Sequence, residues 1–308
     1  MLSLRARIFT FVLNNRHLLR FQLRRRTGVD ENTSIEQLRR ESERTDGLFG
    51  RLPAGFTIEP ITIGNMNAER MTPPDARDDC EILYFHGGGY VLGNARSHRP
   101  IVAKFVRQTG IPTLTFDYRI APEHPFPAAV DDAVAAYTWL LEHGGVPEKI
   151  AFIGDSAGGG LCLALLMAIK EHRLPMPAAV AAMSPWTDLA NSGESFITNA
   201  KTDTLCWTGA QEIFSRHYLN GADPYNPLAS PLYGDMDGLP PIRLYVGGTE
   251  LLRDDATRFV QKAKEAGGDA EVTVGHGLFH CYPVCAPMFP EATEALHEIC
   301  VFIGERLQ

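Results

Sequence analysis

With 308 residues, 44% hydrophobic and 21% charged, the chain has the composition of an ordinary globular protein with a large core. Its formal net charge of −8 argues against nucleic acid as a partner, because binding to phosphates needs a basic face, and favours small uncharged ligands. The run from Ile8 to Leu13 is far shorter than the roughly 18 to 20 residues of a membrane span, so neither stable membrane insertion nor export is expected.

The chain begins with a basic segment. Residues 1–26 contain seven arginines and no acid. Leu4, Ile8 and Val12 recur at i, i+4 spacing, which predicts an amphipathic helix. We expect its apolar face to be buried against other helices of a cap. Contact with anionic lipid is the alternative, because arginines on such a helix also favour a membrane surface.

A second helix is expected before the first strand. The stretch Thr33-Ser34-Ile35-Glu36 has the pattern of a capping box that opens a helix toward Arg44. Both helices precede the regular alternation of strands and helices. Residues 1–50 are therefore expected to form the N-terminal part of a helical cap, and residues 51–308 the main domain.

Short apolar strands alternate with amphipathic helices along the rest of the chain. The expected strands are 56–63, 82–85, 113–118, 150–153, 178–183, 242–246 and 270–274. The expected helices are 100–108, 127–142, 157–172, 255–265 and 291–307. This alternation predicts an α/β fold, with a mostly parallel sheet covered by helices on both faces and an active crevice at the carboxyl ends of the strands.

One segment interrupts the alternation. Residues 188–232 contain no convincing strand and separate two members of the series. We expect them to form an insertion that roofs one end of the sheet and completes the cap.

A serine follows the expected strand 150–153. The stretch Gly154-Asp155-Ser156-Ala157-Gly158 has the G-x-S-x-G pattern, in which small neighbours let a serine sit on a sharp strand-to-helix turn. The pattern also recurs by chance, but here the required strand precedes it and the required helix follows it. Ser156 is therefore the candidate nucleophile.

A nucleophilic serine needs a base and a carboxylate that orients the base. In this fold class they follow the serine in the order acid, then histidine, each after a strand. The loop after the second-last strand offers Glu250, Asp254 and Asp255, and the loop after the last strand offers His276 and His280. Asp255 could also simply cap a helix.

Three glycines follow His86 directly after a buried strand. Acyl transfer needs N–H donors aimed at the oxygen that becomes negative in the tetrahedral intermediate. Bare backbone after a strand allows such close approach. We expect the N–H groups of Gly87, Gly88 and Ala157 to form this oxyanion hole.

Three stretches together resemble the bacterial hormone-sensitive lipase family of esterases, and they are His86 to Gly89, Asp117 to Ala129 and Gly154 to Gly159. The resemblance covers the chain from about residue 50 to its end. It implies an α/β-hydrolase fold with a helical cap completed by an insertion. It also implies hydrolysis of short to medium chain acyl esters by a serine carboxylesterase, through an acyl-enzyme and without metal or cofactor.

The resemblance also chooses between the open alternatives. Leu252 to Asp255 matches an L-R-D element whose aspartate is the triad acid, which favours Asp254. Gly277 to His280 matches a G-x-x-H element and favours His280. In the family a Gly-Phe pair often follows this histidine, whereas Cys281 and Tyr282 follow it here.

Further expectations concern the substrate pocket and the assembly. Tyr90, Asp155 and Trp186 are candidates for the pocket lining, although Trp186 is equally expected to pack in the core. The resemblance implies a homodimer that forms through the edge of the strand at 270–274.

The six cysteines are scattered, with no C-x-x-C pair and no cluster at zinc-ligand spacing. They predict reduced thiols in a cytoplasmic protein, and no metal site. Three rival functions remain: an amidase or thioesterase with the same triad, a non-catalytic protein that binds small molecules on this scaffold, and a lipase that works at a membrane surface.

Overall fold

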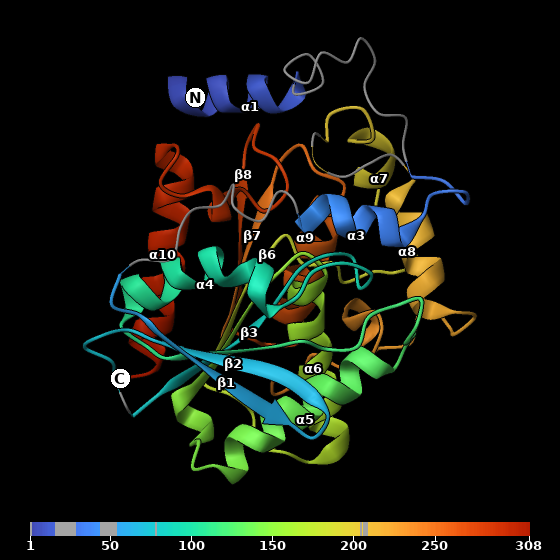
Figure 1. Ribbon diagram of the computed structural model, residues 1–308. Helices are drawn as coiled ribbons and strands as arrows, with labels where there is room; N and C mark the ends of the chain where they lie inside the picture. The colour runs from blue at the N-terminus through green and yellow to red at the C-terminus, as the bar shows by residue number, and fades with distance from the viewer. Residues whose placement is uncertain (1, 16–28, 44–53, 78, 204, 206–208) are drawn as a thin grey trace.

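The computed structural model describes residues 2–15, 29–43, 54–77, 79–203, 205 and 209–308, and its centre is an eight-stranded sheet (Figure 1). The strands are Thr57–Ile63 (β1), Met66–Thr72 (β2), Glu81–Phe85 (β3), Thr113–Phe116 (β4), Ile150–Asp155 (β5), Ala179–Met183 (β6), Ile242–Gly247 (β7) and Ala270–Gly275 (β8). Their order is β1-β2-β4-β3-β5-β6-β7-β8, and β3 to β8 run parallel. The predicted α/β fold with a mostly parallel sheet is confirmed.

Strand β2 is the element that the sequence did not predict. It pairs antiparallel with both β1 and β4. Asn67, Glu69 and Arg70 interrupt its apolar residues, so it does not read as a buried strand. Met66, Ala68 and Met71 are nevertheless buried, which is the partial alternation of a strand near the edge of a sheet.

The helices cover both faces of the sheet. They are Leu4–Asn14 (α1), Ile35–Glu43 (α3), Ala95–Thr109 (α4), Ala128–Glu142 (α5), Ala157–His172 (α6), Ser195–Thr198 (α7), Ala210–Leu219 (α8), Arg253–Glu265 (α9) and Pro290–Arg306 (α10). Short 3₁₀ turns lie at Pro147–Lys149, Pro231–Tyr233 and Tyr282–Cys285. Helix α4 begins before the expected residue 100 because Asn94 and Ser97 form a reciprocal capping box. No helix in these described ranges is long and apolar enough to cross a bilayer.

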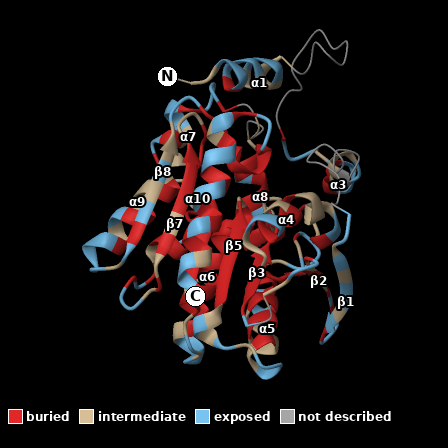
Figure 2. Cartoon of the chain, turned by 90° about the vertical axis from the view of Figure 1, so that its left-hand side faces the viewer, coloured by how far each residue is buried: buried red, intermediate tan, exposed pale blue. Residues whose placement is uncertain are grey.

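Alternating side chains of the strands divide the core in two. On β3, Leu83 and Phe85 point into the cluster shared with α5, α6 and α9, while Ile82 and Tyr84 point into the cluster shared with α4 and α10. The central strands are buried on both faces, as Figure 2 shows. This double coverage explains their uninterrupted apolar sequences.

The two N-terminal helices pack against different clusters. Ile35 and Leu38 of α3 belong to the α6 side, whereas Ala6 and Phe9 of α1 pack on the α10 side. The predicted second helix is present, but its cap lies one residue later than the expected Thr33–Glu36 box: Ser34 accepts from the N–H of Gln37 at 3.2 Å, and the Thr33 hydroxyl bonds Asp30. Arg44 lies outside the described residues.

The expected buried face of α1 is wrong. Leu4, Ile8 and Val12 are 69%, 55% and 42% exposed. Helix α1 lies on the outside of the molecule with this face turned to solvent (Figure 2). The helix carries apolar residues on two sides, and the side with Ala6 and Phe9 is the one that docks.

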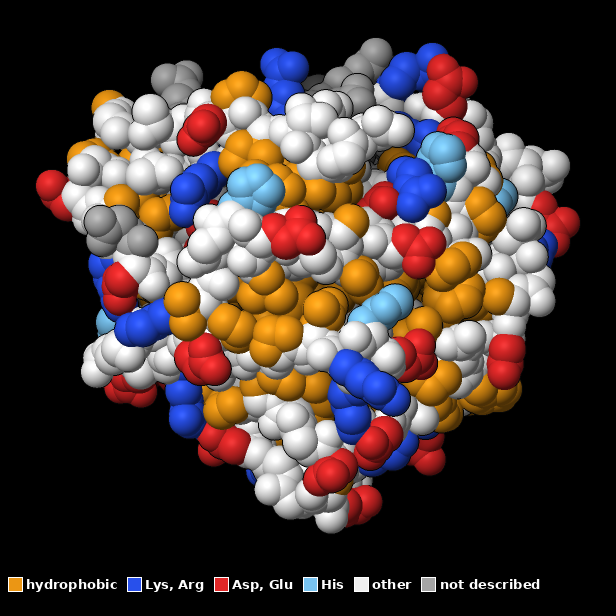
Figure 3. Space-filling model, turned by 90° about the horizontal axis from the view of Figure 1, so that it is seen from below, with side chains coloured by type: hydrophobic (Ala, Val, Ile, Leu, Met, Phe, Trp, Pro, Cys, Tyr) orange, Lys and Arg blue, Asp and Glu red, His pale blue; other side chains and the backbone are white. Residues whose placement is uncertain are grey.

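Helices α1 and α7 lie at the top of Figure 1, and α3 and α8 lie below them on its right-hand side, in the upper half of the molecule. Helices α7 and α8 belong to the segment 188–232, in which the described residues form no strand. Figure 3 shows the opposite end, where acidic and basic side chains are interspersed among apolar ones. The two N-terminal helices and the two helices of the segment 188–232 therefore lie toward the end of the sheet where Ser156 follows β5.

Candidate active site

Ser156 lies on a sharp turn between β5 and α6. Its backbone has φ 55° and ψ −124°, a strained conformation for a residue with a side chain. Gly158 makes this turn fit against the neighbouring strand, because a Cβ there would lie 2.2 Å from the carbonyl oxygen of Phe85. The small residues of the G-x-S-x-G pattern thus hold the half-buried serine hydroxyl at the end of the sheet.

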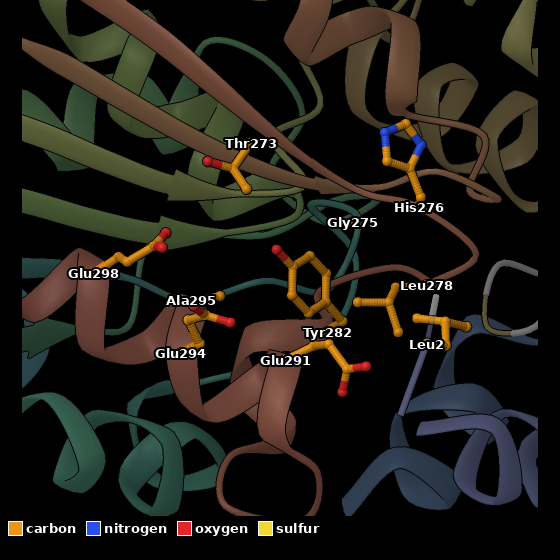
Figure 4. Close-up of a pocket in the computed structure, with 10 residues that line it drawn as sticks. All are labelled: Leu2, Thr273, Gly275, His276, Leu278, Tyr282, Glu291, Glu294, Ala295 and Glu298. Atoms are coloured by element: carbon orange, nitrogen blue, oxygen red, sulfur yellow. The ribbon is translucent and has the colours of Figure 1, made fainter. Parts of the chain in front are cut away.

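The structure brings His280 to this serine. The Nε2 atom of His280 lies 3.0 Å from Oγ of Ser156, although the two residues are 124 positions apart. His280 follows β8, and its side chain is 13% exposed. The alternative, His276, lies on the surface and lines a separate pocket of about 260 Å³ between β8 and α10 (Figure 4).

A buried glutamate faces the other ring nitrogen of His280. Nδ1 of His280 lies 3.2 Å from Oε2 of Glu250, whose side chain has no exposed surface. The hydroxyl of Ser184 donates to the same oxygen at 2.9 Å, and in turn accepts from the N–H of Cys281 at 2.8 Å. This short network joins the ends of β6, β7 and β8 and fixes both the acid and the residue after the histidine.

Burial raises the pKa of Glu250 above its ordinary value. The positive charge that His280 can carry and the hydrogen bonds to Glu250 oppose this rise. The ionised form of Glu250 is therefore stabilised most when His280 is protonated. A triad acid has this relation to its histidine, because it stabilises the imidazolium that forms during catalysis.

The expected position of Asp254 beside the histidine is wrong. Asp254 lies in the first turn of α9, where its carboxylate accepts from the N–H of Ser195 at 2.8 Å and from Nε of Arg253 at 2.9 Å. Glu250 precedes this helix in the turn after β7 and reaches the histidine instead. Asp254 thus ties α9 to α7.

The neighbouring Asp255 also has a structural position. Its fully buried carboxylate accepts from the N–H groups of Thr187 and Asp188 at 2.8 and 2.9 Å. It holds the segment that follows β6 rather than capping its own helix.

The register expected for the oxyanion loop is wrong by one residue. The N–H of Gly87 donates to Oδ1 of Asp155 at 3.1 Å, so it does not face a substrate. Within the described parts of the chain, the N–H groups of Gly88, Gly89 and Ala157 have no hydrogen-bond acceptor. These three donors are the ones left for an oxyanion.

Asp155 was expected in the substrate pocket, and this expectation is wrong. Its carboxylate is buried and accepts from the hydroxyl of Tyr84 at 2.7 Å as well as from Gly87. Burial alone would raise its pKa, but the nearby His98, whose Nε2 lies 3.7 Å from Oδ2, and the hydrogen bond from Tyr84 lower it. A buried ionised carboxylate thus anchors the start of the glycine loop.

The other two pocket candidates lie in an aromatic cluster. Tyr90 is buried, has a φ of 63° and stacks on Tyr218 of α8 with ring centroids 3.9 Å apart. The ring of Trp186 lies 6.3 Å from that of Tyr90, and its Nε1 donates to the carbonyl of Asp188 at 3.2 Å. Contact of Tyr90 and Trp186 with a substrate stays a prediction.

The loop that carries His280 is held from outside by α1. Phe9 stacks on Phe279 with ring centroids 5.7 Å apart and contacts Phe289 at 5.4 Å. The backbone N–H and the hydroxyl of Ser3 donate to Glu291 at 2.5 and 2.8 Å. Helix α1 therefore packs directly behind the residue that precedes the histidine.

Replacing Phe9 with alanine is expected to lower kcat two- to tenfold and to cost about 1 to 3 kcal/mol of stability, somewhat less than the loss of a fully buried phenylalanine. Phe11 is the matched control, because its side chain is 68% exposed on the other face of the same helix. Ester kinetics and thermal melts of the two variants check this. Equal kinetics for Phe9→Ala and Phe11→Ala would show that α1 does not hold the loop.

Across the residues that the structure describes, no group of three or more His, Cys, Asp or Glu side chains is placed to hold a metal ion. Cys80, Cys162, Cys281, Cys285 and Cys300 are free thiols. Cys281 adopts a φ of 53°, the left-handed region that glycine prefers, while its N–H bonds to Ser184. The backbone after His280 is thus held by this hydrogen bond although no glycine is present.

Comparison with known proteins agrees with this geometry. The α/β hydrolase fold family matches residues 82–284. An acetyl-hydrolase of Streptomyces hygroscopicus is 39% identical over 274 residues, which span 88% of this chain and 90% of the relative. A crystal structure of an esterase from the bacterial hormone-sensitive lipase family superposes with a TM-score of 0.89 at 39% identity, covering 99% of each chain. A crystal structure of EstE5 soaked with p-nitrophenyl butyrate gives a TM-score of 0.89 at 34% identity, again over 99% of each chain.

Proposed function

Because this chain belongs to the bacterial hormone-sensitive lipase family of α/β-hydrolases, whose members are carboxylic ester hydrolases, we propose that it cleaves short to medium chain acyl esters with Ser156, His280 and Glu250 as its triad. The observation that carries the proposal is the contact of 3.0 Å between Oγ of Ser156 and Nε2 of His280. Glu250, 3.2 Å from Nδ1, then serves as the triad acid.

In the first half of the reaction, His280 accepts the proton of Ser156 at Nε2 while Oγ forms a bond to the ester carbon. The Nδ1–H of His280 faces Glu250, so the carboxylate selects the tautomer whose Nε2 is free to accept. The imidazolium then gives its proton to the departing alkoxide. An alcohol leaves, and the acyl group stays on Ser156.

The second half repeats these steps with water. His280 removes a proton from a water molecule that attacks the acyl carbon, and returns a proton to Oγ as the acid leaves. In both halves the carbonyl oxygen becomes negative. We propose that the N–H groups of Gly88, Gly89 and Ala157 stabilise this oxygen. Gly89 thus takes the place of the expected Gly87.

The size of the acyl group is proposed by analogy with the relative soaked with p-nitrophenyl butyrate. Residues 1–50 and 188–232 are proposed to cap the acyl site. A series of chromogenic esters of increasing acyl length tests this substrate class. Faster turnover of matched amides or thioesters than of esters would instead favour the amidase or thioesterase alternative.

The proposal predicts that a fluorophosphonate probe labels Ser156 at neutral pH. The probe reacts only with an activated serine, so His280→Ala should abolish labelling while His276→Ala keeps it, because His276 lies on the surface away from Ser156. Mass spectrometry of the labelled peptide checks the site. Labelling of a different residue, or of the His280→Ala variant at the original rate, would overturn the assignment.

We also propose a cytoplasmic homodimer that forms through the edge of the sheet. Strand β8 is the last strand in the sheet order, which leaves one side of it available for pairing. The free thiols of the described cysteines fit a reducing compartment. A monomeric mass in light scattering would contradict the dimer.

A further inference from the structure

We propose that Arg39, on helix α3, is a positioning residue that holds the oxyanion loop in its catalytic conformation. The proposal rests on the assignment of Gly88 and Gly89 as oxyanion donors made above. It gives the N-terminal part of the cap a role in the chemical step, in addition to covering the acyl site.

The guanidinium of Arg39 makes four hydrogen bonds to the body of the protein. Nε donates to the carbonyl of Val91 at 2.8 Å, and Nη2 donates to the carbonyl of Ala121 at 2.8 Å. Nη1 and Nη2 also bind the two carboxylate oxygens of Glu123 at 2.8 and 2.7 Å. One side chain of α3 thus ties together two loops that are separate in the sequence.

The first of these loops continues directly from the oxyanion glycines. The carbonyl of Gly88 accepts from the N–H groups of Val91 and Leu92 at 3.1 and 2.9 Å, which closes the loop into a tight turn. Gly88 and Gly89 have positive φ values, and so does Tyr90. Holding Val91 by its carbonyl therefore fixes the far end of a turn whose backbone is strained.

The second loop supports the same turn from the other side. The N–H of Ala121 donates to the carbonyl of Tyr90 at 2.8 Å. The carbonyl of Ala121 is in turn bound by Arg39, and Glu123 follows closely. Arg39 thus closes a ring of contacts that runs through Tyr90, Val91 and Ala121.

The ion pair with Glu123 fixes the orientation of this guanidinium. The planar fork of arginine matches a carboxylate with two parallel hydrogen bonds, which lysine cannot make. The side chain of Arg39 is 24% exposed and that of Glu123 55%, so solvent reaches the pair from the Glu123 side and shields it less on the Arg39 side. The hydrogen bonds from Arg39 lower the pKa of Glu123 to about 2, so the carboxylate stays charged at any pH at which an esterase is assayed.

The neighbouring Arg40 offers a contrast within the same helix. It pairs with Glu36 one turn away, and the two side chains are 61% and 74% exposed. Such pairs on a helix surface contribute little. Arg40 therefore provides a matched control with the same charge and the same helical position to within one residue.

The placement of the oxyanion donors decides the rate. Backbone N–H groups act on the developing negative charge only at hydrogen-bond distance, and loss of one donor costs roughly 10²- to 10³-fold in kcat in studied enzymes. Loss of Arg39 frees the turn at Val91 but leaves the N–H groups of Gly88 and Gly89 in place. These donors are then held less firmly at hydrogen-bond distance from the oxyanion. We therefore expect a partial loss, smaller than the loss of a whole donor.

The test compares Arg39→Gln with Arg40→Gln on a short ester such as p-nitrophenyl acetate. Arg39→Gln is expected to lower kcat about 10- to 100-fold with KM changed less than about threefold, because transition-state and not substrate contacts are loosened. Affinity for a trifluoromethyl ketone, which forms the tetrahedral adduct, should fall in parallel with kcat/KM. Arg40→Gln should stay within twofold of the wild type in each measurement.

Two further variants keep the outcome decisive. Glu123→Gln removes the ion pair but leaves the bonds from Arg39 to both carbonyls, so its kcat should fall less than that of Arg39→Gln. Arg39→Lys should lie between the wild type and Arg39→Gln. If Arg39→Gln does not fold, the kcat and the ketone affinity of Glu123→Gln and Arg39→Lys are compared with those of Arg40→Gln instead.

An unchanged kcat in a folded Arg39→Gln or Arg39→Lys variant would overturn the proposal. So would a lower kcat with unchanged affinity for the ketone, since that pattern indicates general destabilisation. These failures concern Arg39 alone. Failure of the triad assignment would appear separately, as an active Ser156→Ala enzyme.

Discussion

Replacing Ser156 with alanine is expected to lower kcat by about 10⁴- to 10⁶-fold while the chain remains folded. Without Oγ no acyl-enzyme forms, and His280 has no proton to take. What remains is binding of the ester and stabilisation of its carbonyl oxygen by backbone donors, which alone give a small rate above that of water. The measurement is steady-state turnover of a chromogenic ester, with circular dichroism as the control for folding.

The same variant separates catalysis from binding. KM, or the dissociation constant of an unreactive ester analogue, should change little, because the hydroxyl occupies a small part of the site. Turnover within tenfold of the wild type would show that another residue is the nucleophile.

The second large effect is expected for Glu250→Gln, which should lower kcat about 10³- to 10⁴-fold, as the corresponding change does in a studied triad. The amide keeps the shape of the side chain but removes the charge that faces Nδ1 of His280, and it can bind the wrong tautomer. Asp254→Asn is the matched control, since the two carboxyls lie on the same stretch of chain. It should keep kcat within about threefold and cost roughly 0.5 to 2 kcal/mol of stability through its contact with Ser195.

The stability of Glu250→Gln should depend on pH in a specific direction. Burial raises the pKa of Glu250 in the folded protein, so folding favours its protonated form. Its contribution to stability is complete below the ordinary carboxyl pKa and is lost as pH rises through the raised value. Relative to the wild type, the glutamine variant should therefore become more stable as pH rises from acid to neutral, although it is inactive.

Thermal melts from acid to neutral pH check this. A variant that loses stability relative to the wild type as pH rises would contradict the raised pKa. An inactive Asp254→Asn together with an active Glu250→Gln would restore the original assignment.

The sequence predicted the catalytic serine and histidine better than it predicted the triad acid. The strand-to-helix pattern chose Ser156, whereas the loop after the last strand offered both His276 and His280, and only the family resemblance favoured His280. The structure brings Ser156 and His280 together. The acid was ambiguous because Glu250, Asp254 and Asp255 all follow β7, and sequence order does not say which side chain turns inward. The usable signal was proximity to the strand end: Glu250 lies in the turn, whereas Asp254 is already in α9.

Two other errors have physical causes that the sequence does not display. Three successive glycines do not show in the sequence which of their N–H groups face the substrate. In the structure the buried carboxylate of Asp155 accepts from Gly87, so the N–H groups of Gly88 and Gly89 remain available as donors. The docking side of α1 was ambiguous because apolar residues lie on two sides of the helix. The choice depends on Phe279 and Phe289, which come 270 and 280 positions after Phe9.

The contacts of α1 also have a consequence for biosynthesis. Ser3 binds Glu291, a partner 288 positions further along the chain. At roughly 5 to 20 residues per second, a ribosome needs about 15 to 60 s to reach Glu291 after it has made Ser3. During that time α1 has no docking site, and both of its apolar sides lie in water beside a run of arginines. Attachment of α1 is thus among the last events of folding, and the nascent chain offers chaperones an exposed amphipathic segment that the finished enzyme half conceals.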